Sequence, residues 1–61
     1  MNHIYNNVLQ ARINFLDTWN YSSLLDLARA HGLLTNLSYS AFLHYLAEEL
    51  PPSFWKQYKL R

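Results

Sequence analysis

Histidine, serine and acidic residues are the side chains in this sequence that could take part in catalysis. Nucleophilic catalysis needs a hydroxyl held beside a base, and no Ser, His and Asp here follow the spacing of a known catalytic motif. The adjacent residues Glu48 and Glu49 cannot face each other on a helix, so they do not form an acid–base dyad. A helical domain of this length also rarely encloses a substrate pocket. We therefore expect neither catalysis nor a small-molecule substrate.

The three histidines, His3, His31 and His44, are the candidate metal ligands. No two of them are spaced i, i+4 as in the HExxH pattern, which places two ligands on one face of a helix. Cysteine is absent, which removes both disulfides and thiolate metal sites. The sequence therefore predicts no metal site and no cofactor.

The C-terminal tail, residues 53–61, is the segment with the most distinctive chemistry. All of its charged side chains are basic, whereas acidic residues outnumber basic ones in the rest of the chain. Cations that alternate with aromatic side chains suit nucleic-acid backbones and acidic partner surfaces. The candidate binding residues of the tail are Trp55, Lys56, Tyr58, Lys59 and Arg61. The alternative is that Phe54 and Trp55 fold back to complete a thin core while the lysines face solvent.

Helices must position these side chains, because apolar residues recur at helical spacing in three segments. The spacing predicts helices over residues 3–19, 22–31 and 39–50, followed by the tail over 53–61 as a short helical turn. No strand-like alternation or internal repeat is visible in the sequence. The sequence therefore predicts an all-α fold with a single domain over residues 1–61.

The first of these helices carries two adjacent apolar rows, a wider stripe than one partner helix normally covers. The candidate partner-binding residues on this stripe are Ile4, Val8, Phe15 and Trp19. A small domain often gains stability from a second subunit, and a two-fold dimer is the commonest arrangement. We therefore expect the chain to bind a protein partner or a second copy of itself.

Local signals mark the ends of the other helices. Asn20 or Ser22 is expected to cap the second helix, and Gly32 is expected to stop it in the left-handed conformation. Ser38 is the expected N-cap of the third helix, which ends before Pro51. The leucines of the linker over residues 33–37 are expected to fill the core.

The composition excludes several classes of protein. Of 61 residues, 15% are charged and 16% are aromatic, which argues against disorder, and the net charge of +1 is too small to hold nucleic acid by itself. Polar residues interrupt the uncharged stretch over 30–47, so we expect no membrane insertion. The N-terminus lacks the pattern of a signal peptide. These features favour a cytoplasmic protein, and the many Asn and Tyr residues suit a bacterial mobile element or phage.

Two runs near the C-terminus are similar to those of a known family. They are Tyr39-Ser40-Ala41 with His44 and Leu46-Ala47-Glu48, and Leu50-Pro51-Pro52-Ser53-Phe54-Trp55-Lys56. Both resemble the Hha/YmoA family of small nucleoid-associated regulators, in which an acidic residue at the position of Leu43 contacts the partner H-NS. The run from Leu37 to Leu46 also resembles a helix of transposition helper ATPases of the IstB type.

Together the residues favour a small helical regulatory or interaction protein that docks on a protein partner or on itself. Its predicted surface is the stripe of the first helix. The alternative is a regulator that binds nucleic acid directly through the basic and aromatic tail.

Overall fold

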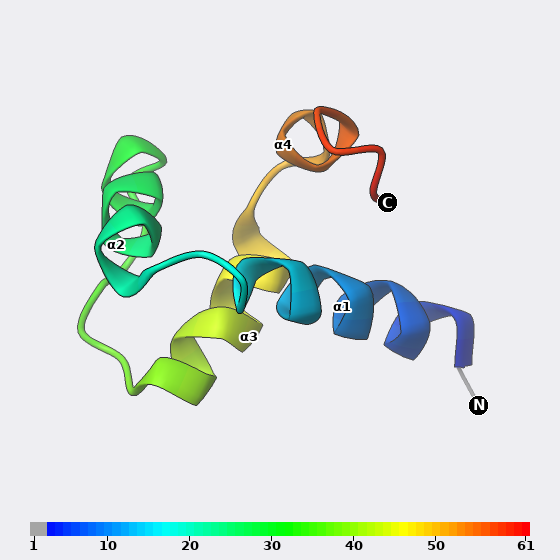
Figure 1. Cartoon of the computed structure of the whole chain (residues 1–61), viewed down its shortest axis with the longest axis horizontal. Coiled ribbons are helices and arrows are strands. Elements are labelled where there is room, and N and C mark those ends of the chain that lie inside the picture. Colours follow the sequence, from blue (N-terminus) through cyan, green and yellow to red (C-terminus); the bar gives the residue numbers. More distant parts are fainter. Residues whose placement is uncertain (1–2) are drawn as a thin grey trace.

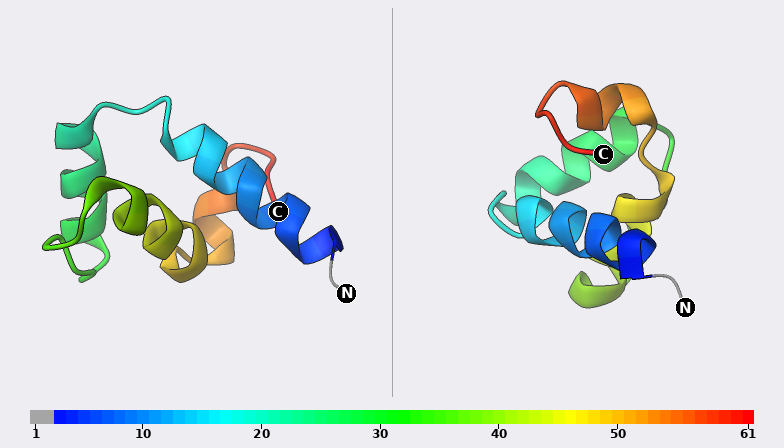
Figure 2. Two further views of the ribbon diagram at one scale, coloured as in Figure 1. Left: turned by 90° about the horizontal axis from the view of Figure 1, so that it is seen from below. Right: turned by 90° about the vertical axis from the view of Figure 1, so that its right-hand side faces the viewer.

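The computed structural model describes the backbone of residues 3–61 and the side chains of residues 7–61. The described residues form four helices and no strand, and the predicted all-α fold is confirmed (Figure 1). They are α1 His3–Leu16, α2 Tyr21–Ala30, α3 Tyr39–Glu49 and α4 Pro52–Lys56. Helix α1 packs along α3, α2 crosses the end of this pair, and α4 returns over α1 (Figure 2). This return is what brings the tail to the first helix.

Helix α1 ends at Leu16, three residues earlier than the predicted end at Trp19. The backbone tightens here, because the amides of Thr18 and Trp19 donate to the carbonyl oxygens of Phe15 and Leu16, three residues back. The Thr18 hydroxyl also donates to the Phe15 carbonyl oxygen at 2.6 Å. A threonine side chain that bonds to nearby backbone competes with the helical hydrogen bonds, which explains the early end.

Both ends of α2 follow the local signals. Of the two candidate caps, Asn20 is the N-cap, and its side-chain oxygen accepts from the Ser23 amide at 2.8 Å. Gly32 has a φ of 67°, and the amide of Leu33 donates to the carbonyl oxygen of Ala28 at 2.8 Å. This is the Schellman arrangement, in which glycine takes the left-handed position at little cost.

The linker leucines enter the core only in part. Leu33 and Leu37 are half-buried against it, but Leu34 is 56% exposed, so the prediction that the linker leucines fill the core is wrong for this residue. The Leu34 amide instead donates to the Tyr45 hydroxyl at 3.0 Å. This bond ties the linker to α3 and turns the Leu34 side chain outward.

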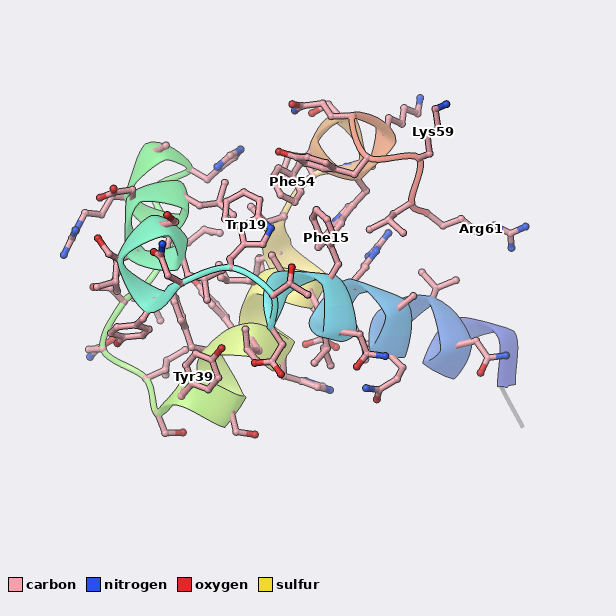
Figure 3. All side chains as sticks on the ribbon, viewed as in Figure 1. Phe15, Trp19, Tyr39, Phe54, Lys59 and Arg61 are labelled. Atoms are coloured by element: carbon pink, nitrogen blue, oxygen red, sulfur yellow. The ribbon has the colours of Figure 1, made fainter. Side chains whose placement is uncertain are left out.

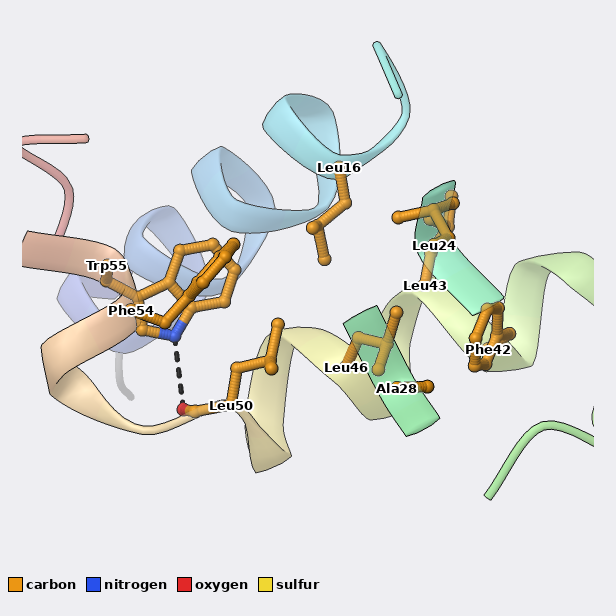
Figure 4. Packing of buried hydrophobic residues seen from close by; sticks show 9 residues of the cluster. All are labelled: Leu16, Leu24, Ala28, Phe42, Leu43, Leu46, Leu50, Phe54 and Trp55. Carbon is orange, nitrogen blue, oxygen red and sulfur yellow. Dashed lines mark hydrogen bonds between the residues drawn. The ribbon is translucent and has the colours of Figure 1, made fainter. Parts of the chain in front are cut away.

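One hydrophobic cluster joins all four helices (Figure 4). Its largest fully buried side chains are Trp55, Phe42, Leu16, Leu24 and Leu46. The Trp55 indole nitrogen donates to the Leu50 carbonyl oxygen at 3.2 Å, so this polar atom is buried with a partner. Over the described residues, no helix is long and apolar enough to cross a membrane.

Candidate functional site

Helix α4 brings the two predicted binding segments together in one aromatic cluster, which consists of Phe15, Trp19, Phe54 and Tyr58. Figure 3 shows Phe15 of α1 and Trp19 of the segment that follows α1 pointing toward Phe54 of α4. The ring centroids are 4.8 Å apart for Phe15 and Tyr58, and 6.0 Å apart for Trp19 and Phe54. Phe15 and Trp19 are half-buried, and Tyr58 is 40% exposed. The cluster therefore combines a packed interior with an aromatic outer face.

A groove continues this surface toward the N-terminal half of α1. Its walls are α1 on one side and the end of the tail on the other, and its volume is about 350 Å³. It is lined by Asn7, Val8, Ala11, Lys59, Leu60 and Arg61. Val8 and Ala11 precede Phe15 on the same side of α1 at helical spacing, so the groove and the aromatic cluster form one continuous surface. We call this the α1–tail surface.

The end of the tail follows the backbone pattern already seen after α2. The Leu60 amide donates to the Trp55 carbonyl oxygen at 3.0 Å, and the Lys59 amide donates to the Lys56 carbonyl oxygen at 3.1 Å. Lys59 takes the left-handed position of this Schellman motif, with a φ of 59°. The turn aims Leu60 back at the core, where it is half-buried. It therefore fixes the wall of the groove.

Arg12 connects α1, α3 and the tail. Its guanidinium lies 4.9 Å from the centre of the Trp55 ring, and its Nη1 donates to the Ala47 carbonyl oxygen at 3.0 Å. Its Nε donates to the backbone oxygen of Arg61. Sequence reasoning missed this role of Arg12. No residue pattern points to it, because both hydrogen-bond acceptors are backbone oxygens far away in the sequence.

The structure describes the side chains of three of the four predicted partner-binding residues. Val8 lines the groove, and Phe15 and Trp19 belong to the aromatic cluster. The side chain of Ile4 lies outside the described residues. The structure therefore places the three described candidates on the same surface.

The predicted tail residues divide between the core and the surface. Trp55 has no exposed surface, and Phe54 is also buried. Trp55 therefore serves the core and offers nothing to a partner, which corrects its assignment to the binding residues of the tail. The remaining candidates are exposed, namely Lys56, Tyr58, Lys59 and Arg61.

A second groove of about 680 Å³ lies between α1 and α3. It includes His44 and Glu48, whose side chains are 3.9 Å apart and spaced i, i+4, a pair that sequence reasoning missed. Both side chains are about half exposed, so this contact contributes little to stability. Across the described part of the chain, no three metal-ligating side chains lie together.

A hydrogen bond between two exposed side chains gives the only pKa shift that the described residues show clearly. The Tyr39 hydroxyl donates to Asp17 Oδ1 at 2.7 Å. This bond, with some desolvation and the nearby carboxylate charge, raises the pKa of Tyr39 above its usual value near 10. Tyr39 lies beside Tyr21 and outside the α1–tail surface.

No family model matches the chain, and neither a curated protein nor a solved structure is similar enough to match it.

Proposed function

We propose that the chain is a small interaction protein that docks another protein chain on the α1–tail surface, without catalysis. The observation that carries the proposal is the aromatic cluster, in which residues of α1 and the tail meet although they are distant in the sequence. Tryptophan and tyrosine are the residue types that most often dominate the energy of protein interfaces. Trp19 and Tyr58 keep part of their rings open to solvent.

The groove beside the cluster supports binding rather than chemistry. Among the described residues, the polar side chains that line it are Asn7, Lys59 and Arg61, and no histidine, hydroxyl or acidic side chain of this part of the chain lines it. A general base or nucleophile would have to come from such groups. The described lining can therefore recognise a partner and offers no catalytic pair.

Either a different protein or a second copy of the chain fits this proposal. Helix α4 and the tail already cover part of the α1 stripe, which leaves less apolar surface for a dimer than the bare helix would offer. A charged substitution on α1 such as Leu16→Asp would not distinguish a different protein from a second copy. Leu16 is fully buried, and a charge there is expected to unfold the chain. The test must use exposed positions.

Site-specific photo-cross-linking tests the proposal. A benzophenone amino acid replaces Tyr58 in one variant and Tyr39 in a matched control, because both tyrosines are exposed to a similar degree, 40% and 43%. After irradiation in a lysate of the source cells, we expect a protein adduct from position 58 and little from position 39. Mass spectrometry of the adduct distinguishes a second copy from a different protein. Equal adducts from both positions, or none from position 58, would contradict the proposal.

Direct nucleic-acid binding is the second candidate function, and the exposure of the tail favours it. Lys56, Lys59 and Arg61 all face solvent beside the exposed ring of Tyr58. Each contact to a phosphate of a single strand should steepen the log–log dependence of affinity on salt by about 0.7. Fluorescence anisotropy with a single-stranded oligonucleotide measures this slope. Binding that persists when all three cations are changed to Gln would exclude this function. An affinity that does not depend on the salt concentration would also exclude it.

The resemblance to Hha/YmoA suggests a nucleoid protein as the partner. In that family the contact is made by an acidic residue at the position of Leu43, but here Leu43 is buried in the core. Any such partner would therefore have to use another surface, and the α1–tail surface is the one we propose. Recovery of a nucleoid protein by the cross-linker at position 58 would support this version.

A further inference from the structure

We infer that the groove of the α1–tail surface binds an acidic peptide segment of a partner protein, with an apolar side chain of the peptide on the groove floor. This inference rests on the proposed docking function and adds the chemistry of the partner. It follows from three features of the groove, namely its apolar floor, its unpaired cations and its fixed wall.

The floor of the groove consists of three apolar residues, Val8, Ala11 and Leu60. Val8 and Leu60 are half-buried, and Ala11 is exposed. Alanine contributes only a methyl group to this lining. The volume of about 350 Å³ lies within the range of about 300–1,000 Å³ that is usual for ligand clefts. A branched aliphatic or aromatic side chain can enter it.

The charged side chains that line this floor are basic. Lys59 and Arg61 line the groove, both are exposed, and neither side chain forms an ion pair within the described residues. No acidic side chain of the described residues lines the groove. An incoming carboxylate therefore meets two cationic side chains and no acidic one, which is the charge complementarity that selects partners.

Two acidic residues of the same chain have contacts outside the groove. Asp26 pairs with Arg29 at 3.6 Å, and Asp17 accepts the Tyr39 hydroxyl. A nucleic-acid strand would satisfy the two cations but would place charged phosphates over the apolar floor, which costs desolvation. A peptide that carries both carboxylates and an apolar side chain matches both parts of the groove, and we commit to this occupant.

Hydrogen bonds order the wall that carries the two cations. Arg12 donates to the backbone oxygen of Arg61, and the Leu60 amide is bonded to the Trp55 carbonyl oxygen. A groove that is already ordered loses less conformational entropy when a peptide binds. Arg12 is therefore a positioning residue, because it acts on the groove through the tail that it holds in place.

A display library of random linear peptides, selected on the full chain, tests the inference. We expect the enriched peptides to share an apolar residue flanked by Asp or Glu. Their affinities are then measured by fluorescence anisotropy with two matched pairs of variants. Ala11→Gln fills the groove, whereas Asn14→Gln introduces the same side chain on α1 outside it. Arg61→Gln removes a cation of the groove, whereas Arg29→Gln removes a cation of α2.

We expect Ala11→Gln to weaken binding by at least about tenfold, because a buried contact is blocked. Arg61→Gln should weaken it by about two- to fivefold, the usual effect of one exposed charge pair, and added salt should reduce this difference. Asn14→Gln and Arg29→Gln should leave the affinity unchanged. Circular dichroism of each variant confirms that the helices are intact.

Several outcomes would overturn the inference. Enriched peptides that lack acidic residues but are blocked by Ala11→Gln would refute the charge argument and leave the docking function standing. An absence of enriched peptides, or binding that Ala11→Gln does not weaken, would refute the groove as the binding site. Cross-linking at position 58 would still test the docking function. A single-stranded oligonucleotide that Ala11→Gln weakens more than any peptide would assign the groove to nucleic acid. A homodimer that Ala11→Gln dissociates would assign it to a second copy.

Discussion

Arg12→Met should destabilise the fold far more than the loss of a charge from the surface usually does. The structural reason lies at the end of α3. The carbonyl oxygen of Ala47 would normally accept from the amide four residues later, but that residue is Pro51, which has no N–H. Arg12 Nη1 supplies the missing donor at 3.0 Å and adds a positive charge near the C-terminal end of the helix.

The magnitude follows from the contacts that are lost. Ala47 is fully buried, and an acceptor left without a partner there costs about 1–3 kcal/mol. The loss of the cation–π contact with Trp55, at 4.9 Å, adds about 0.5–1 kcal/mol. Methionine retains an apolar stem on the Trp55 ring, so packing is largely kept. We therefore expect a loss of about 2–3 kcal/mol in the free energy of unfolding, and in a domain of this size a decrease in Tm of about 8–24 °C.

Thermal and urea unfolding followed by circular dichroism measure this loss. Arg29→Met is the matched control, because the Arg29 side chain is 63% exposed and only 3.6 Å from Asp26 in a surface pair. This control should change stability by less than about 0.5 kcal/mol. Arg12→Lys should give an intermediate loss of about 1 kcal/mol, since lysine keeps the charge without the planar fork.

An Arg12→Met variant as stable as Arg29→Met would refute the reasoning. It would mean that the end of α3 finds another donor, such as water, and that the tail does not depend on Arg12. If Arg12→Met is too unstable to purify, the Arg12→Lys variant still measures the direction and size of the effect.

Three further predictions concern the helix ends and one ionisable side chain. Lys59→Gly should raise the free energy of unfolding by about 0.5–1 kcal/mol in urea titrations, because glycine adopts the positive φ of 59° without strain, and a loss of stability would contradict this. Asn20→Ala should cost about 1 kcal/mol, whereas Ser38→Ala should cost much less, since only Asn20 makes a side-chain hydrogen bond to its helix; equal losses in thermal unfolding would refute this difference. The raised pKa of Tyr39 in the folded state means that its contribution to stability is complete below pH 10 and disappears as the pH rises through the folded pKa. In ultraviolet titration Tyr39 should ionise at higher pH than in the Asp17→Asn variant, and identical titrations would exclude the hydrogen bond.

The parts of the fold that depend on local signals could be predicted from the sequence. Asn20 was one of two predicted candidates for the cap of α2, and the left-handed stop at Gly32 was predicted, because each signal depends on residues within one helical turn. The predicted end of the first helix was wrong, because the side chain of Thr18 makes a competing hydrogen bond that the apolar periodicity does not reveal. The exposure of Leu34 was also missed, because it follows from a bond to Tyr45 in another element.

The candidate site could be predicted only as separate pieces. Phe15 and Trp19 were identified from the stripe, and Tyr58 and Lys59 from the composition of the tail. That they form one surface depends on the direction in which α4 leaves α3, which no residue spacing states. The role of Arg12 was missed for the same kind of reason, because its acceptors are backbone atoms that every residue has.

The contacts of Arg12 also determine the order in which this chain can fold. Its hydrogen-bond partners are 35 and 49 residues away in the sequence, so α1 is synthesised long before the residues that complete its surroundings. Helices form locally within about a microsecond, whereas contacts between distant segments must first close a long loop. We therefore expect the contact between the rings of Trp19 and Phe54 to form after the helices do. A change in the fluorescence of Trp19 and Trp55 that follows the gain of helical structure would report this docking of the tail.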